Sequence, residues 1–381
     1  MELLYHQARA RRYNSSNMKI IYDARYLLLD ERFDGVSRYT LELARALSGQ
    51  SDVELTWLVY DERQLAKLPA GQHLMVNDPQ DILRETFFLP RQLSKLDCDV
   101  VYSPFFMMGT LGHRYPLVLT IHDMIYFAHR TPPYQFSWWI RAGWWLFHAT
   151  YWPMRWILNQ ASVVATVSAT ARQELLEAKA TKREITTVLN AVAQDVKPLE
   201  GTAHYKSNDI VYMGAFTPYK NVECLIDAMS ELPDMKLHLL SKMPRVRREV
   251  LEARMRERGV FDQIVIHDGV SDDTYRELLA SCRCLVTASK LEGFGLPVIE
   301  AQQQGVPVVC SDTPIFHEVG AHSVMYFDPD SPLACAAQIK SLGDEKTSED
   351  YIARGFENVK RFTWNDSAKT AVEICKSVIK I

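Results

Sequence analysis

The sequence predicts an α/β protein composed of two doubly wound, Rossmann-like domains. Short β-branched runs alternate with amphipathic stretches from residue 18 onward, as parallel sheets with crossover helices require. The alternation pauses once, over the polar segment 196–208 with Pro198 and Gly201, and then restarts. The 381 residues are also too many for one ordinary core and suit two domains.

In the first domain, residues 18–195, Tyr39, Leu43 and Leu47 belong to a helical pattern, and the runs around it predict strands. The expected strands are 20–22, 53–60, 99–103, 117–121 and 163–167. In the second domain, residues 209–365, they are 210–213, 235–240, 264–267, 284–287 and 306–310. Ligands of such sheets bind at the carboxyl ends of the strands, so two facing domains would hold a ligand in the cleft between them.

Composition excludes several classes. A net charge of −4 gives no basic field for nucleic acid. Seven scattered cysteines predict reduced thiols in a cytoplasmic protein. No signal peptide or apolar run of spanning length is visible. Residues 1–17 are either an extension without fixed structure or precede a true start at Met18, and the sequence leaves both open.

The segment 289–300, SKLEGFGLPVIE, carries the most chemistry. It follows an expected strand, contains Gly293 and Gly295, and leads into a helix that should begin near Pro297. Glycines let backbone N–H groups approach a ligand, and a helix N-terminus favours an anion such as a diphosphate. The flanking carboxylates of Glu292 and Glu300 suit sugar and ribose hydroxyls. The plainer alternative is an ordinary loop with two solvated glutamates.

These residues resemble glycosyltransferase family 4, the retaining enzymes with the GT-B fold. The family's two glutamates, separated by seven residues, correspond to Glu292 and Glu300. The likeness extends over almost the whole chain from Met18. The further similar segments are DAR (23–25), GVSRYTLELARAL (35–47), TIHD (120–123), VS (167–168), VLN (188–190), GAFTPYKN (214–221), GVPVV (305–309), SDTPIFHEVG (311–320), FDP (327–329) and FTW (362–364). GAFTPYKN is similar to a mannosyltransferase-like branch.

The resemblance implies two Rossmann-like domains facing a central cleft, with a C-terminal helix, 366–381, that crosses back to the N-terminal domain. It also implies three catalytic residues. Lys220 would neutralise the leaving diphosphate, His122 would contact the transferred sugar, and Glu292 would bind its hydroxyls. The implied donor-binding residues are Gly35, Gly214, Lys220, Asn221, Val270, Gly293, Phe294, Gly295, Leu296 and Glu300.

Plainer readings stand beside these roles: a solvated Lys220, a structural His122 and an ordinary turn at Gly35. Many relatives carry an arginine where this chain has Ala215 and Phe216. Its substitute would be one of the arginines at 245, 247 and 248, unless these form a solvated helix face.

The branch resemblance favours GDP-mannose as donor and a hydroxyl of a glycan or glycolipid as acceptor, in cell-envelope glycan biosynthesis. UDP-, dTDP- and other GDP-sugars remain open. The resemblance implies that neither a cofactor nor a metal is needed, so we expect none. A non-catalytic sugar-nucleotide-binding partner of a glycan assembly complex is the competing class. A nicotinamide dehydrogenase is not expected, because no Gly-x-Gly-x-x-Gly follows the first strand.

Tryptophan is concentrated in one stretch, 137–158, which holds six of the eight tryptophans together with Arg141 and Arg155. We expect this stretch to form one helix, in which Trp138, Trp145, Trp152 and Trp156 share a face. Trp and Arg together are typical of a membrane interface, so this face is a candidate contact for the inner face of the membrane or a lipid-linked acceptor. An aromatic core or a dimer interface is the alternative.

Overall fold

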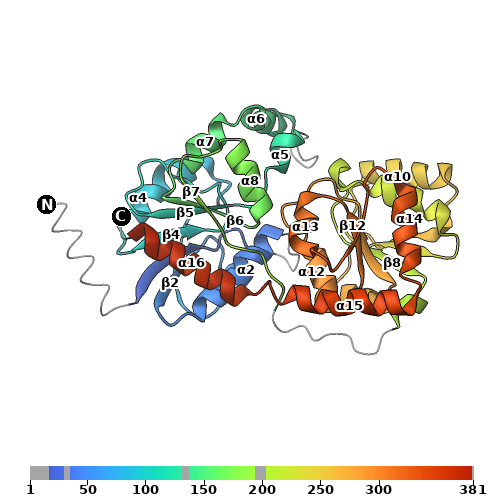
Figure 1. Cartoon of the computed structure of the whole chain (residues 1–381). Coiled ribbons are helices and arrows are strands. Elements are labelled where there is room, and N and C mark those ends of the chain that lie inside the picture. The colour runs from blue at the N-terminus through green and yellow to red at the C-terminus, as the bar shows by residue number, and fades with distance from the viewer. Residues whose placement is uncertain (1–16, 30–34, 131–136, 194–202, 380–381) are drawn as a thin grey trace. The chain divides into compact units, whose positions relative to one another are not determined.

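The computed structural model describes residues 17–29, 35–130, 137–193 and 203–379. Nearly all of the predicted N-terminal extension and part of the predicted linker lie outside these ranges. The chain divides into two compact units, unit 1 (Met1–Asn190 with Thr363–Ile381) and unit 2 (Ala191–Phe362). Each unit is a parallel sheet covered by helices, which confirms the predicted α/β class (Figure 1).

Unit 1 contains a seven-stranded sheet in the order β3-β2-β1-β4-β5-β6-β7. The strands are β1 (Met18–Asp23), β2 (Val53–Val59), β3 (Gln72–Met75), β4 (Val100–Ser103), β5 (Leu117–Ile121), β6 (Val163–Thr166) and β7 (Glu184–Thr187). Strands β4, β5 and β6 are buried at every position, as expected for central strands covered on both faces. In register, Ile20 lies opposite Val100 and Leu55.

The helices of unit 1 cover this sheet. They are α2 (Gly35–Ser48), α3 (Glu62–Leu65), the π-helical turn η1 (Arg84–Phe88), α4 (Leu89–Leu93), α5 (Ile125–Ala128), α6 (Trp138–Ala149), α7 (Trp152–Leu158), α8 (Ala169–Glu177) and α16 (Trp364–Ile379).

Helix α16, at the C-terminus, packs along α2 within unit 1 (Figure 1). Helix α2 buries Tyr39, Leu43 and Leu47, which recur at helical spacing. The Tyr39 ring meets the buried Trp364 edge-on, with ring centroids 5.7 Å apart. The Ser367 hydroxyl donates to the Leu189 carbonyl at 2.6 Å. The last helix is therefore part of the core of the first unit.

Unit 2 contains a six-stranded sheet in the order β10-β9-β8-β11-β12-β13. The strands are β8 (Asp209–Tyr212), β9 (Lys236–Leu239), β10 (Ile264–Ile266), β11 (Cys284–Thr287), β12 (Val308–Ser311) and β13 (Met325–Phe327). The helices are η2 (His204–Lys206), η3 (Pro218–Lys220), α9 (Val222–Ala228), η4 (Met229–Glu231), α10 (Arg245–Glu257), η5 (Phe261–Gln263), α11 (Asp272–Ser281), α12 (Leu296–Gln303), α13 (Pro314–Gly320), α14 (Pro332–Ser341) and α15 (Glu345–Val359).

The prediction of one continuous tryptophan-rich helix is wrong. Helix α6 ends at Ala149, Thr150 is extended (φ −137°, ψ 158°), and α7 begins at Trp152. The reason is Pro153, which has no N–H and whose ring would collide with the Ala149 carbonyl in an unbroken helix. Proline is instead accommodated in the first turn of a new helix.

Candidate functional site

The chemically richest loops of unit 2 follow the neighbouring strands β8 and β11. Strand order reverses between these two strands, because β8 continues to β9 on one side while β11 continues to β12 on the other. Such a switch point leaves a crevice at the carboxyl ends of the strands, where ligands bind in open α/β sheets. The predicted donor loops, 213–221 and 288–295, begin at this crevice.

The loop after β8 is shaped by a close backbone approach at Gly214. A Cβ atom there would lie 2.8 Å from the Tyr212 hydroxyl, which itself donates to the Ala215 carbonyl at 2.7 Å. The Gly214 N–H donates to the Ser241 hydroxyl at 3.1 Å. Glycine is therefore required sterically at this position, and its N–H already has a partner within the loop.

Lys220 ends the short helix η3, and its ammonium group meets the Glu292 carboxylate. The Nζ–Oε1 distance is 2.5 Å, and both side chains are only 14% exposed. Asn221 adopts the left-handed conformation (φ 53°) and donates from Nδ2 to the Pro329 carbonyl at 2.8 Å, which fixes the turn into α9. The structure thus brings together two of the three predicted catalytic residues as an ion pair.

The loop after β11 is tied to the Lys220 loop. The Lys290 N–H donates to the Tyr219 carbonyl at 2.8 Å. This backbone hydrogen bond joins the loop that carries Glu292 to the loop that carries Lys220. Gly295 has φ +92°, and a Cβ there would lie 2.9 Å from the Phe316 ring. It caps α12, whose first residues are Leu296 and Pro297, so the predicted helix start near Pro297 is confirmed.

Phe294 and Glu300, on either side of Gly295 in the sequence, are held by contacts with other parts of unit 2. Phe294 is buried, and its ring meets Phe362 edge-on at 5.6 Å. Glu300, half-buried on α12, accepts a hydrogen bond from the Tyr275 hydroxyl at 3.4 Å. The backbone of Phe294, Gly293 and Gly295 is thereby presented at the carboxyl edge of the sheet.

Val270 lies at the carboxyl end of a third strand, β10. The Gly269 N–H donates to the Leu240 carbonyl at 2.9 Å, and the left-handed residues Asp268 and Gly269 turn the chain toward α11. Val270 is half-buried there, directly before the α11 N-cap Ser271. The predicted donor-binding residues of unit 2 thus follow strands β8, β10 and β11 along one edge.

Arg247 has neither of its two predicted roles, a second phosphate cation or part of a solvated helix face. It is buried, donates to the Phe216 carbonyl at 2.6 Å and pairs with Glu223 at 2.6 Å. It therefore holds the 213–221 loop in place rather than facing solvent. Arg245 and Arg248 do lie on the solvated face, in i,i+4 pairs with Glu249 and Glu252.

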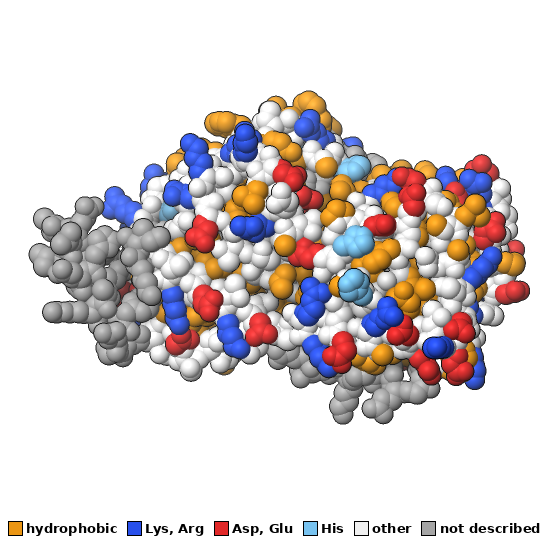
Figure 2. Space-filling view, viewed as in Figure 1, with side chains coloured by type: hydrophobic (Ala, Val, Ile, Leu, Met, Phe, Trp, Pro, Cys, Tyr) orange, Lys and Arg blue, Asp and Glu red, His pale blue; other side chains and the backbone are white. Residues whose placement is uncertain are grey.

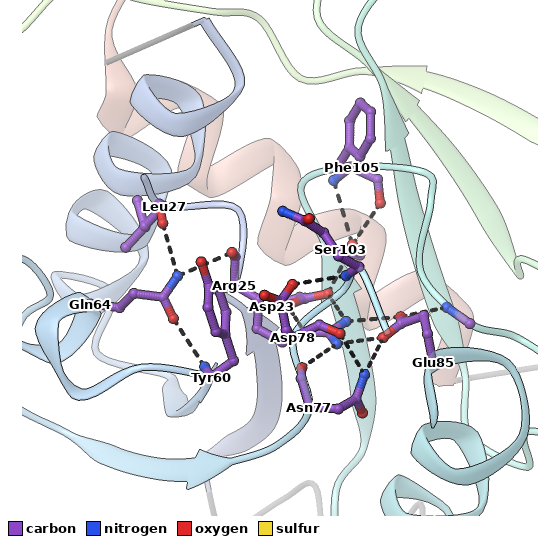
Figure 3. A network of polar contacts seen from close by, with 12 residues as sticks. Asp23, Arg25, Leu27, Tyr60, Gln64, Asn77, Asp78, Glu85, Ser103 and Phe105 are labelled. Atoms are coloured by element: carbon purple, nitrogen blue, oxygen red, sulfur yellow. Dashed lines mark hydrogen bonds and ion pairs between the residues drawn. The ribbon is translucent and has the colours of Figure 1, made fainter. Parts of the chain in front are cut away.

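In unit 1 the switch point lies between β1 and β4, and a buried ionic network occupies it (Figure 3). Arg25 donates to both oxygens of Asp23 at 2.8 Å and to both oxygens of Glu85 at 2.6 and 3.1 Å. Burial would lower the pKa of Arg25, but the charges of Asp23 and Glu85 and their hydrogen bonds outweigh it and raise this pKa well above its ordinary value. Arg25 is therefore permanently charged and fully engaged.

The network ties together the loops at the carboxyl ends of four strands. Besides Arg25, Glu85 accepts from the Asn77 side chain at 2.9 Å and from the Gly109 N–H at 2.8 Å. Ser103 bridges Asp23 and the Phe105 carbonyl, and Gln64 donates to the Arg25 and Leu27 carbonyls (Figure 3). From the sequence alone, the DAR segment (23–25) shows only a family likeness. Its structural role depends on Glu85, 60 residues away.

His122 follows β5 and is held in one orientation. Its Nε2 lies 2.8 Å from the Pro104 carbonyl, which can only accept, so Nε2 carries the proton and Nδ1 keeps a lone pair. Burial lowers the pKa of His122 to about 4, against the opposing effect of that hydrogen bond. The Tyr39 ring of α2 packs edge-on against the imidazole at 5.0 Å. His122 is thus a neutral acceptor near neutral pH.

Gly35 is the first residue of α2, one turn before Tyr39. A methyl group there would meet no atom of the described residues within 4 Å, so nothing in that part of the chain requires glycine sterically. Gly35 and His122 therefore belong to unit 1, whereas the other predicted catalytic and donor-binding residues belong to unit 2.

Comparison with known proteins places these sites in a family context. A family model described as glycosyl transferases group 1 matches residues 200–358, and one described as glycosyltransferase family 4 matches residues 33–196. The chain is 27% identical over 377 residues to O-antigen chain mannosyltransferase B of Escherichia coli, covering 90% of this chain and 96% of the relative.

Two solved structures share the fold at low identity. Sucrose-phosphate synthase from Thermosynechococcus elongatus superposes with a TM-score of 0.73 at 16% identity, covering 95% of this chain and 99% of that one. Anabaena Alr3699/HepE, solved in complex with UDP and glucose, gives 0.71 at 17% identity, with 95% and 100% covered.

Proposed function

Because the chain belongs to glycosyltransferase family 4 and has the GT-B fold, we propose that it is a retaining mannosyltransferase that uses GDP-mannose. The acceptor would be a hydroxyl of a glycan or glycolipid in cell-envelope biosynthesis. Mannose is favoured by the likeness to the Escherichia coli mannosyltransferase, which extends over nearly the whole length of both chains. The sugar nucleotide itself is favoured by the complex of the Anabaena relative with UDP and glucose.

The observation that carries the proposal is the Lys220–Glu292 pair at the switch point of unit 2. A donor diphosphate can replace the Glu292 carboxylate as the partner of Lys220, because it offers more negative charge to the same ammonium group. Released from Lys220, the Glu292 carboxylate can accept hydrogen bonds from sugar hydroxyls. The start of α12 adds its positive dipole end beside the phosphate.

Two further residues would orient the donor. Glu300, already held by Tyr275, would accept from the ribose hydroxyls. The free Nδ1 of His122 would accept a hydrogen bond from a hydroxyl of the transferred sugar. Neither residue is required to exchange a proton, which agrees with the low pKa of His122.

In the proposed reaction, the bond between the sugar C1 and the leaving phosphate oxygen breaks. The acceptor oxygen bonds to C1 on the same face, so the configuration is retained. The acceptor proton passes to the departing phosphate oxygen. Lys220 and the α12 start stabilise the charge that accumulates on the diphosphate, which is the main electrostatic contribution expected of the protein.

A thermal-shift panel tests the donor. GDP-mannose and GDP at about 100 times their Kd should stabilise the fold by about 2.7 kcal/mol, which raises Tm by several degrees. UDP-glucose, UDP-N-acetylglucosamine and dTDP-sugars at the same concentration should leave Tm unchanged. A shift with UDP or dTDP compounds alone would refute GDP-mannose. Binding of GDP-mannose without hydrolysis or transfer would instead favour a non-catalytic binding partner.

A further inference from the structure

The surface of unit 1 formed by α6 and α7 exposes apolar side chains where a surface helix normally exposes polar ones. The exposed fractions on α6 are 81% for Trp138, 63% for Trp139, 52% for Trp145 and 68% for Leu146. On α7, Trp152 is 71% exposed and Trp156 43%. Orange and blue side chains are interspersed over these two helices in Figure 2. We call this set of residues the tryptophan surface.

These tryptophans do not form an aromatic core, because a different set of residues packs inward. Trp144 stacks on His148 with ring centroids 4.0 Å apart and meets Tyr126 of α5 edge-on at 5.2 Å. Phe127 of α5 contacts Phe147 and stacks on Tyr151. Helix α6 is thus apolar on its inner face and on its outer face. The inner face packs on α5, so the outer face needs another apolar environment to cover it.

A pocket of about 530 Å³ opens beside the exposed rings of α7. Its lining combines Trp152 and Trp156 with three cations, Arg155, Lys182 and Arg183. Arg155 and Arg183 donate to the carbonyls of residues 178, 179 and 159, which fixes their guanidinium groups. Among the described residues, none of these three cations forms an ion pair with a carboxylate.

The sequence around the tryptophan surface is free of acidic side chains. No Asp or Glu occurs between residues 124 and 173. Two exposed carboxylates are adjacent in sequence to the residues of the pocket: Glu184 follows Arg183, and Glu177 precedes Ala178, whose carbonyl Arg155 binds. The three cations that line the pocket outnumber them. Rings that favour a bilayer interface therefore lie beside cations that favour phosphate.

We propose that the tryptophan surface docks on a bilayer that contains anionic phospholipid, with a headgroup phosphate in the pocket of Arg155, Lys182 and Arg183. The exposed rings enter the headgroup region while α6 and α7 lie along it. No helix in the part of the chain that the structure describes is long and apolar enough to span a membrane. A twofold contact with a second copy is disfavoured, because it would place like charges of the same patch together.

This docking is independent of the donor chemistry and can be tested without it. The full-length protein is incubated with vesicles of phosphatidylcholine alone or with about one-third phosphatidylglycerol, and binding is measured by flotation. We expect binding to the anionic vesicles, weaker binding to neutral ones, and loss at high salt. Failure to bind either kind of vesicle, or equal binding to both, overturns the proposal.

Variants separate the rings from the charges. Trp152→Ala should weaken binding about tenfold, because a large apolar ring no longer enters the interface. Lys182→Ala should weaken it about fivefold, and only on anionic vesicles. Arg155 is left intact, since it also holds the end of α8. If Trp152→Ala fails to fold, Trp138→Ala in helix α6 replaces it in the same test.

Matched controls lie in unit 2. Leu333→Ala removes an apolar side chain that is 65% exposed, and Lys346→Ala removes an exposed cation. Both should bind vesicles as the wild type does. The oligomeric state is measured by light scattering in parallel. A wild-type dimer that Trp138→Ala converts to a monomer, with no vesicle binding by either protein, would assign this surface to a second copy and refute the membrane.

Discussion

The two sheets reverse their strand order in the same way, but the carboxyl edges at the two reversals are built differently. In unit 1 the position between β1 and β4 is occupied by Asp23, Arg25 and Glu85, whose side chains are at most 7% exposed. In unit 2 the two glycine-containing loops after β8 and β11 are joined by the pair of Lys220 and Glu292. At the switch point of unit 1, the charged groups therefore all bind one another. At the switch point of unit 2, Lys220 can exchange Glu292 for a ligand.

This difference between the two switch points indicates that the same sheet topology has a structural role in unit 1 and a ligand-binding role in unit 2. A buried network in which every charge has several partners fixes the loops that it joins. A single half-buried pair can be opened by a ligand that carries the same charge as one partner. We therefore expect substitution of Arg25 at the unit 1 switch point to change mainly stability, and substitution of Lys220 at the unit 2 switch point to change mainly catalysis.

The largest effect is expected from Arg25→Met. Removing this guanidinium leaves two buried carboxylates without their cation, which should lower the free energy of unfolding of unit 1 by about 3–5 kcal/mol. Urea denaturation followed by intrinsic fluorescence measures it. Arg63→Met, which removes the exposed partner of Asp61, is the control and should cost less than about 1 kcal/mol. Equal effects of the two variants would contradict the contrast between the switch points.

Lys220→Ala should slow transfer by about 100- to 1,000-fold, because the leaving diphosphate loses its cation. Its unfolding free energy should fall by about 1–3 kcal/mol, less than for Arg25→Met, because one partly buried carboxylate rather than two buried ones loses its partner. Initial rates with GDP-mannose and urea denaturation of the same preparations measure both quantities. Lys236→Ala removes an exposed lysine at the opposite end of sheet strands in unit 2 and should leave the rate unchanged. If Lys220→Ala transfers at the wild-type rate, the assigned role of Lys220 is wrong.

Gly295→Ala should destabilise unit 2 by about 1–3 kcal/mol, because an alanine at φ +92° is strained and its Cβ would meet the Phe316 ring. Gly35→Ala is the matched change in unit 1, where no described atom lies within 4 Å of the added methyl group. Its effect should be within about 0.5 kcal/mol. Thermal unfolding distinguishes them, and similar losses in both would show that the α12 loop is not held as described.

The smallest effect concerns pH. Burial lowers the pKa of His122 from its ordinary value of 6.5 to about 4 in the folded protein, so the unfolded chain takes up this proton first as pH falls. The His122 contribution to stability is complete above pH 6.5 and declines toward pH 4. Between pH 6.5 and 5.5 it should fall by about 1 kcal/mol.

The measurement compares urea denaturation of the wild type and His122→Gln at both pH values. The variant should lose less stability over this interval than the wild type, because glutamine does not titrate while its amide can still donate to Pro104. His148 and His204, whose pKa values burial also lowers, titrate equally in both proteins and cancel in the difference. Identical pH dependence of the two proteins would place the His122 pKa near its ordinary value.

The interior strands were predictable because continuous apolar runs between turn signals are buried on both faces. Strand β5, predicted and observed at 117–121, is an example. The edge strands β3, β7 and β13 were missed, since each is short and β3 and β7 are largely polar. The remaining edge strand, β10, was predictable because all three of its residues are apolar.

The same distinction applies to the site. The glycine loop and its glutamates could be found because their spacing is local. The Lys220–Glu292 bond joins residues 72 apart, and the Arg25–Glu85 bond joins residues 60 apart, so neither follows from spacing. The break between α6 and α7 differs from these contacts, because Pro153 is a local signal in the sequence for the start of a new helix.

Because helix α16 belongs to unit 1, the first unit to begin synthesis is the last to be completed. Unit 1 needs residues 364–379 to cover α2 and to enclose Trp364, yet all of unit 2 is encoded between the two parts of unit 1. At about 5–20 residues per second, a ribosome would need roughly 10 to 35 seconds to bridge that interval. During this time the apolar face of α2 that α16 later covers would remain exposed on the nascent chain, where chaperones can bind it. A premature stop codon anywhere in unit 2 would leave that face exposed permanently.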